Sequence, residues 1–376
     1  MFPQLDPTEA TYLARMIVSI LGVLLFLTLA VWMIRRKQKT ITTEADAIGS
    51  SDGTKAAAPA VALEDNSERH ITLEQAYQTW KAERLLQSED GRSLFVRAGV
   101  EKSGLRYQLV ANAQVQAFAI LLSTLMSERD PQAREQAEAL FASLLAHPAY
   151  GEGDLSSWQY LPDLPRSPRL DPDPHAEAWL IHALLTATKR LPEMRRFNYS
   201  ELIQARTLAL NKYIENQDPE LRGQFPFCGY LVTQLKTYLP DLDWSGLGEN
   251  QELFYSQMEE PGFFDAKRDV SWLGLSLLQL GMLAFFEGDP KSADVIRKAL
   301  PGLLQLVEDC MNDAATPTEF SPSSMLACLV PALLTVGDQE INERVWDRLI
   351  ILQPEKNDGL GATLKLLGMA WLMGIR

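Results

Sequence analysis

From residue 72 onward, apolar residues recur at intervals of three and four along most of the chain, which is the spacing of helices that bury one face. Proline and glycine interrupt this pattern, so it predicts separate helices joined by loops. No convincing strand is expected, and no repeat of fixed period indicates an array of tetratricopeptide or similar units. The pattern predicts about eleven helices, at residues 73–86, 113–126, 131–146, 176–190, 200–216, 231–239, 271–286, 290–310, 323–336, 341–352 and 362–374.

The predicted fold class is therefore all-α. Paired helices that close into an α/α barrel account for this series better than an open array does, with an incomplete or degenerate barrel as the alternative. The two most apolar runs, 273–286 and 326–336, are too short to cross a bilayer. We interpret them as core helices of the barrel.

A different pattern occupies residues 16–34, where 19 uncharged and nearly all apolar residues follow one another. At about 1.5 Å per residue this segment spans the hydrocarbon of a bilayer, so it predicts a transmembrane helix. Basic residues at 35–39 follow the apolar core, whereas a cleaved signal peptide carries them before it. The predicted divisions are a flank at 1–15, an anchor at 16–34, a basic flank and flexible linker at 35–71, and a folded body at 72–376.

The charges beside the anchor predict which side of the membrane holds the body. Arg15 precedes the anchor together with Asp6 and Glu9, while four basic residues follow it. The positive-inside rule therefore predicts a single-pass protein of a bacterial inner membrane whose body lies in the cytoplasm.

Composition narrows the choice of partners. The chain has 376 residues and a net charge of −14, so its body would repel nucleic acid and anionic lipid. Neutral glycans and cationic partners remain compatible with this charge. The cysteines at 228, 310 and 328 are odd in number and lack metal-site spacing, which predicts neither a disulfide framework nor a zinc site.

A polar, proline-rich loop that begins at Asp171 leads into a predicted buried helix at 176–190. In this helix Ala183-Leu184-Leu185 follows His175-Ala176-Glu177. The stretch resembles glycoside hydrolases of family 8, including the periplasmic cellulases of bacterial cellulose synthesis. In that family Asp-Ala-Asp stands before a helix that contains Ala-Leu-Leu, so the helix is similar while its acidic pair is altered.

Further segments resemble the same family in the same order along residues 73–376. The resemblance implies a six-hairpin α/α barrel that acts on polysaccharide outside the cytoplasm. A periplasmic body is thus the alternative to the orientation that the flanking charges predict. The matching segments are Trp80, Gly91-Arg92, residues 112–122, Ser157-Trp158, the stretch at 171–190, residues 264–268 with Trp272, and residues 366–371.

An inverting glycosidase needs one carboxylic acid that protonates the leaving oxygen and one carboxylate that activates water, about 6.5–9.5 Å apart. Where the family has its acid, a Glu in a glycine-rich segment, this chain has Asn112 and lacks the glycines. An amide cannot donate that proton. The family's proposed base corresponds to Asp265, with Arg268 close behind it. The alternative for Asp265 is a helix cap or a partner of Arg268.

His175 and Glu177 are weaker catalytic candidates. They could form a rewired acid pair, because histidine titrates near neutrality and a shielded glutamate can hold its proton. The alternative is that Glu177 is a first-turn acid favoured by the helix dipole, and His175 a loop or cap residue. Asp171 and Asp173 could replace the missing aspartates only if the loop shifts. No metal or cofactor is predicted, since His175 and His182 would need further ligands.

Aromatic residues gather in or beside the loops that would rim an α/α barrel, where their faces could stack on sugars. Trp158 and Phe264 are the preferred platforms, and with Asn112 and Arg268 they form the predicted substrate-binding set. The alternative is that most of the aromatic residues belong to the core. They are Trp158, Tyr160, Trp244, Phe254, Tyr255, Phe263, Phe264 and Trp272.

Three functional hypotheses follow. The preferred one is a membrane-anchored, catalytically inactive relative of the family that binds a glycan, or serves as an accessory subunit, in cellulose-type exopolysaccharide synthesis or secretion. The second is a helical scaffold that binds other proteins of a membrane complex. The third is an active inverting endo-β-1,4-glucanase that uses Asp265 as its base.

Overall fold

The computed structural model describes residues 67–376 except 90, 104–105, 152–153, 163–169, 217–227, 242–243, 245–250, 261–262, 265–269, 313–319 and 376. These residues belong to one compact unit, Ala57–Arg376. The predicted flank at 1–15, the predicted anchor at 16–34 and most of the predicted linker lie outside the described residues. Within the described part, no helix is both long and apolar enough to cross a membrane.

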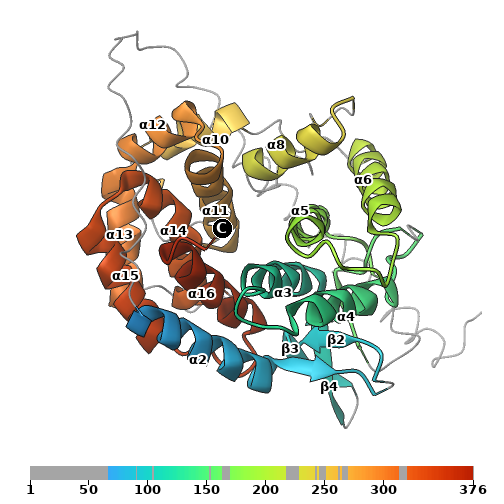
Figure 1. The fold of residues 1–376 in the computed structure, drawn as a ribbon. Helices are drawn as coiled ribbons and strands as arrows, with labels where there is room; N and C mark the ends of the chain where they lie inside the picture. The colour runs from blue at the N-terminus through green and yellow to red at the C-terminus, as the bar shows by residue number, and fades with distance from the viewer. Residues whose placement is uncertain are drawn as a thin grey trace, which may run out of the picture. The chain divides into compact units, whose positions relative to one another are not determined.

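A closed inner ring of helices organises this unit (Figure 1). Each helix of the ring contacts the next, and the last returns to the first. The ring consists of α3 (Ala113–Leu125), α5 (Pro174–Arg190), α8 (Gly229–Tyr238), α11 (Val270–Phe286), α14 (Pro322–Val336) and α16 (Gly359–Leu372).

Outer helices alternate with the inner ones along the sequence and pack on them from outside (Figure 1). This alternation confirms the predicted α/α barrel for the described body. The outer helices are α2 (Ser67–Arg84) on α16, α4 (Ala133–Leu145) on α3, α6 (Tyr199–Glu215) on α5, α12 (Pro290–Lys298) on α11 with α10 (Gln251–Met258) against it, and α13 (Leu300–Met311) and α15 (Gln339–Ile351) on α14.

Glycines allow the inner helices to approach closely. Gly274 of α11 faces Phe320 at the start of α14, and Gly281 faces Ala332 near its end, so the two helices run in the same direction. A Cβ atom at Gly281 would lie 2.4 Å from the backbone nitrogen of Ala332. Gly368 of α16 faces α14 in the same manner. Helices α11 and α14 are apolar on most sides and are buried, which confirms their interpretation as core helices.

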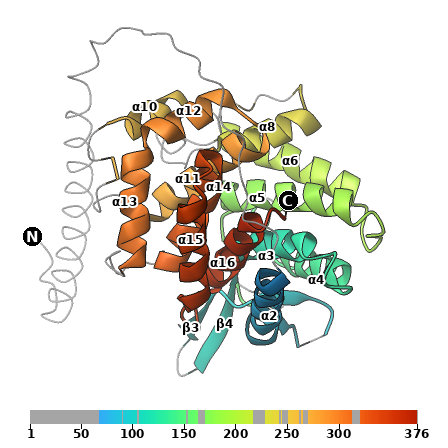
Figure 2. The same ribbon diagram turned by 60° about the vertical axis from the view of Figure 1, so that its left-hand side comes forward.

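The expectation of no strands was wrong. A two-stranded antiparallel hairpin joins β1 (Leu85–Gln87) to β2 (Leu94–Val96), and a three-stranded sheet contains β3 (Gly99–Ser103), β4 (Arg106–Asn112) and β5 (Gln159–Tyr160). Strands β1, β2 and β5 have only two or three residues each, and Leu85 and Leu86 continue the apolar spacing of α2, so no alternation marks where the helix ends. Figure 2 shows β3 and β4 at one end of the barrel, with α8, α10 and α12 toward the other.

Two helix predictions also need correction. The segment 290–310 was predicted as one helix, but it divides at Ala299 into α12 and α13. Pro301 lies in the first turn of α13, where its missing N–H costs nothing, whereas it would interrupt a continuous helix. Helix α10 was missed because its 8 residues are too few to show a clear period.

Candidate functional site

The candidate functional site is the end of the barrel at which inner helices α3, α5, α14 and α16 begin. Trp158 links two of these starts, because its carbonyl accepts from the Ala113 N–H at 2.9 Å and its own N–H donates to the Asp171 carbonyl at 3.2 Å. The starts of α14 and α16 also touch, since a Cβ atom at Gly361 would lie 2.6 Å from Ser321 Oγ. We refer to this end as the N-terminal end of the ring.

Polar side chains cap these helices at the N-terminal end of the ring. Each cap satisfies a backbone N–H that has no partner within its own helix. The parallel helix starts also gather partial positive charge, which favours oxygen-rich and anionic groups. The caps are Asn112 to the N–H of Gln114 (2.8 Å), Asp173 to that of His175 (2.9 Å), Ser321 to that of Ser324 (3.4 Å) and Asp358 to that of Gly361 (2.6 Å).

Asn112 ends β4 and caps α3. Its Oδ1 accepts hydrogen bonds from two backbone N–H groups, which fixes the orientation of the amide and leaves Nδ2 as a donor. In the described portion of the chain Nδ2 has no protein acceptor. Asn112 pairs with Gln159 across the β4–β5 ladder, next to Trp158. Trp158 is 40% exposed and lies opposite Ala113, the next position of the ladder, so an accessible indole and an amide donor occupy neighbouring backbone positions at this end.

Glu177 is fully buried in a hydrogen-bonded ion pair. Its Oε2 lies 2.8 Å from Arg206 Nη1 of α6, and its Oε1 accepts from the Ser156 N–H at 2.5 Å. Arg206 is also buried and donates to Ser156 Oγ at 3.2 Å. The three residues join α5, α6 and the loop before β5. Since no part of the carboxyl group is exposed, a sugar reaches Glu177 only if this cluster rearranges.

His175 lies in the first turn of α5 beside Cys228, which precedes α8. Its Nδ1 is 3.2 Å from Cys228 Sγ. Burial lowers the pKa of His175, while the nearby Asp173 carboxylate acts in the opposite direction. Burial and then Asp173 raise the pKa of the Cys228 thiol. The structure therefore does not bring His175 and Glu177 together as a pair: each has its own partner.

His182 lies two turns farther along α5, among aromatic rings. It meets Tyr230 edge to face at 5.1 Å and Trp179 at 5.8 Å. Burial, with a smaller contribution from Lys189, lowers the pKa of His182 to about 4, so the ring is neutral at pH 7. Over the residues that can be described, no group of three His, Cys, Asp or Glu side chains is placed to hold a metal ion.

The carboxylates of the loop before α5 lie at the N-terminal end of the ring. Asp171 is exposed, and its backbone carbonyl holds Trp158. Asp173 is half-buried and uses Oδ1 to cap α5. The predicted base Asp265 and the predicted substrate-binding residue Arg268 lie outside the described residues.

Phe264, the second predicted sugar platform, packs against protein. Its ring meets that of Phe263 edge to face at 5.0 Å, and a Cβ atom at Gly302 of α13 would lie 2.0 Å from it. Of the remaining aromatic candidates Trp272 is half-buried, and the others belong to the core: Tyr160, Trp244, Phe254, Tyr255 and Phe263. Trp158 is thus the predicted platform that the structure leaves accessible.

Three further residues at or near this end have contacts that the sequence did not predict. Tyr150 is 71% exposed, on the same loop as Trp158, and its N–H donates to the Leu170 carbonyl at 3.1 Å. Arg206 and Cys228 are the partners of Glu177 and His175. Tyr150 could have been found as an aromatic residue of a rim loop, whereas no spacing in the sequence relates Arg206 or Cys228 to their partners.

Solved structures with a similar fold are carbohydrate-active enzymes. A β-1,3-1,4-glucanase from Paenibacillus sp. X4 matches with a TM-score of 0.64 and 11% identity, over 85% of this chain and 96% of that one. A cold-adapted family 8 xylanase in complex with substrate matches with a TM-score of 0.57 and 12% identity, over 82% of this chain and 92% of that one. A reducing-end-xylose releasing exo-oligoxylanase matches with a TM-score of 0.58 and 14% identity, over 83% of this chain and 94% of that one.

These matches span nearly the whole of each enzyme, and they confirm the family 8 resemblance at the level of the fold. Sequence comparison found no matching family model and no matching curated protein.

Proposed function

We propose that this chain is a membrane-anchored glycan-binding protein that holds a β-linked glucan or xylan chain at the N-terminal end of the ring without cleaving it. The fold supports this class of ligand, because the enzymes that share it are named for a β-1,3-1,4-glucan, for xylan and for xylo-oligosaccharides. We further propose that it serves as an accessory subunit in the synthesis or secretion of a cellulose-type exopolysaccharide.

Two residues at this end carry the proposal, Trp158 with its exposed side chain and Asn112 with its amide donor. A sugar ring has apolar C–H faces and polar hydroxyl edges, so a flat aromatic surface with a hydrogen-bond donor beside it suits one sugar unit. Trp158 supplies an accessible indole face, and Asn112 supplies a fixed amide donor. Backbone hydrogen bonds on both sides of Trp158 hold this geometry without help from a ligand.

The functional groups at this end support the proposed absence of hydrolysis. The residue that corresponds to the family's acid is an amide, which cannot supply a proton to a leaving oxygen. Glu177 is buried against Arg206, and Asp173 caps a helix, so neither is placed as a ready substitute. General acid–base assistance is worth about 10²–10⁴-fold per group, so loss of the acid alone removes most activity.

Anchoring through residues 16–34 would keep the bound glycan near the membrane. The basic residues at 35–39 support a body on the cytoplasmic side of the membrane. The net charge of −14 supports a neutral rather than an anionic glycan.

The proposal is tested by titrating the body, as a chain that lacks residues 1–40, with mixed-linkage gluco-oligosaccharides and xylo-oligosaccharides by calorimetry. We expect saturable binding that weakens at least about tenfold in Trp158→Ala, because roughly 1.4 kcal/mol of stacking is lost, and that largely persists in Trp158→Phe. Leu208→Ala is the matched control, since Leu208 is also exposed but lies on α6. Equal binding by Trp158→Ala and wild type would remove Trp158 from the site, and no binding at all would favour the protein scaffold.

A further inference from the structure

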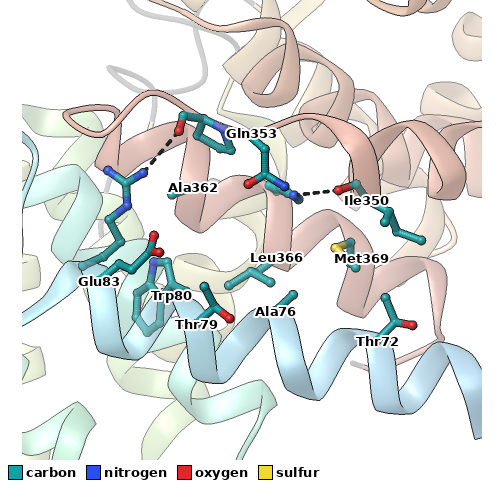
Figure 3. Close-up of a pocket in the computed structure, with 13 residues that line it drawn as sticks. Thr72, Ala76, Thr79, Trp80, Glu83, Ile350, Gln353, Ala362, Leu366 and Met369 are labelled. Carbon is teal, nitrogen blue, oxygen red and sulfur yellow. Dashed lines mark hydrogen bonds between the residues drawn. The ribbon is translucent and has the colours of Figure 1, made fainter.

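A cavity of about 210 Å³ lies on the outer side of the ring, between α2, α16 and the end of α15 (Figure 3). Helix α2 contributes Ala76 and Trp80, and α16 contributes Leu366 and Met369, so one part of the wall is apolar. Figure 3 shows Thr72 and Thr79 from α2 on one side and Gln353 on the other. The volume suits a small molecule of about ten heavy atoms rather than a polymer chain.

Lys365 of α16 brings a charge to this cavity while being only 8% exposed. Its ammonium donates to the carbonyl of Leu352 at 2.7 Å and to that of Ile350 at 3.4 Å, at the end of α15. An ammonium has three N–H donors. As far as the structure is described, the third has no protein acceptor and no carboxylate lies within ion-pair distance. Buried charges are ordinarily paired, so the third N–H suits an anionic or oxygen acceptor within the cavity.

Arg84 strengthens the positive character of the cavity. It is buried beside the same turn and donates to the carbonyls of Pro354, Glu355 and Lys356. Among the described residues of the lining, the acidic one is Glu83, which is exposed at the rim. Their charges are thus two buried cations and one solvated acid, in a chain whose net charge is −14.

Capping of α15 accounts for two of the Lys365 donors, since cations stabilise helix C-termini. It does not account for the third donor, nor for a cavity next to it. Arg84 already donates to three backbone carbonyls, so a phosphate would meet one available ammonium donor and leave most of its oxygens unsatisfied, whereas a carboxylate on an apolar body matches that donor and the apolar part of the wall.

We propose that this cavity binds a small monocarboxylate with a compact apolar body, whose carboxylate accepts the third N–H of Lys365 and whose body lies against Trp80, Leu366 and Met369. The site is separate from the N-terminal end of the ring and does not depend on glycan binding. Occupancy would bridge α2, whose first residues at 67–71 fall within the predicted linker, to α15 and α16 of the barrel.

The test compares benzoate with its neutral isostere benzamide, by calorimetric titration of the full-length chain in detergent at pH 7. Wild type should bind benzoate at least about tenfold more tightly than benzamide, which corresponds to one charge-assisted hydrogen bond. Lys365→Met should lose that preference and still bind benzamide. Ala76→Leu, which fills the cavity from α2, should bind neither, and Lys291→Met, which removes an exposed lysine of α12, should behave as wild type.

Several outcomes would overturn the proposal. Equal affinity of wild type for benzoate and benzamide would show that Lys365 selects no anion, and no binding of either would show that the cavity holds water only. Tighter binding of inorganic phosphate than of benzoate would exclude the monocarboxylate. If Lys365→Met does not fold, the wild-type comparison and Ala76→Leu still decide the question.

Discussion

The buried pair of Glu177 and Arg206 gives a sharp prediction, because the same glutamate is a catalytic candidate by sequence and a structural residue by its contacts. Replacement by glutamine keeps the shape and the oxygen that accepts from the Ser156 N–H. It removes the negative charge that faces Arg206 at 2.8 Å. We therefore expect Glu177→Gln to destabilise the body strongly.

The size of the expected loss in the free energy of unfolding follows from the burial of both side chains. Glu177 and Arg206 side chains are 0% and 3% exposed, so the guanidinium would be left charged and unpaired where water cannot reach it. Breaking one partner of such a pair costs about 3–5 kcal/mol, a large part of the 5–15 kcal/mol typical of a whole domain. Replacing both residues by apolar ones of similar size, as in Glu177→Leu with Arg206→Met, should cost less than either single change.

Urea unfolding of the chain that lacks residues 1–40, followed by circular dichroism, measures these differences. The matched control is Glu308→Gln, because Glu308 pairs with Arg344 at 2.6 Å but both side chains are more than 40% exposed. Its cost should stay below about 1 kcal/mol. A cost for Glu177→Gln as small as that of the control would refute the structural assignment, and would return Glu177 to the list of catalytic candidates.

Three further predictions test other parts of the account. Burial lowers the pKa of Lys365 from 10.5 to about 8, so between pH 8 and 10.5 the unfolded chain binds one proton more than the folded chain. The free energy of unfolding should therefore rise with pH across that range. The rise should be roughly 2–3 kcal/mol smaller in Lys365→Met, and identical pH profiles of the two proteins would contradict this prediction. Gly281→Ala should cost more than about 2 kcal/mol in urea unfolding, because its Cβ meets the backbone of α14, and a neutral effect would show that the helices can separate. A reporter fused after Arg376 should be cytoplasmic, and periplasmic alkaline phosphatase activity would reverse the orientation.

The sequence predicted the parts of the fold that depend on local pattern. Helices such as α11 and α14 are apolar on most sides, and the ring they form follows from burying such helices together. The strands were missed because Leu94–Val96 and Gln159–Tyr160 are too short to show alternation. They exist because other segments lie next to them: β5 pairs with β4, and Gln116 of α3 bonds both the N–H and the carbonyl of Val96.

The candidate site was predictable only in part, for a similar reason. Asn112 and Trp158 were identified by their place in a family pattern, and the structure brings their backbones to the same end of the barrel through the pairing of β4 with β5. Glu177 forms an ion pair with Arg206 on another helix, and Phe264 packs against Gly302 on α13. No local spacing in the sequence encodes these contacts. An exposed and a buried aromatic residue look alike in a sequence, so burial was needed to separate Trp158 from its neighbours.

The central claim is that the chain binds a β-glycan and leaves it intact. The most direct measurement incubates the body at saturating gluco- and xylo-oligosaccharide, at the concentrations set by the calorimetric titration, and follows reducing ends over time. We predict full occupancy that depends on Trp158, with no release above the rate of a heat-inactivated sample. Release of reducing ends by the unmodified protein, abolished by Asp265→Asn, would contradict the account and establish a hydrolase.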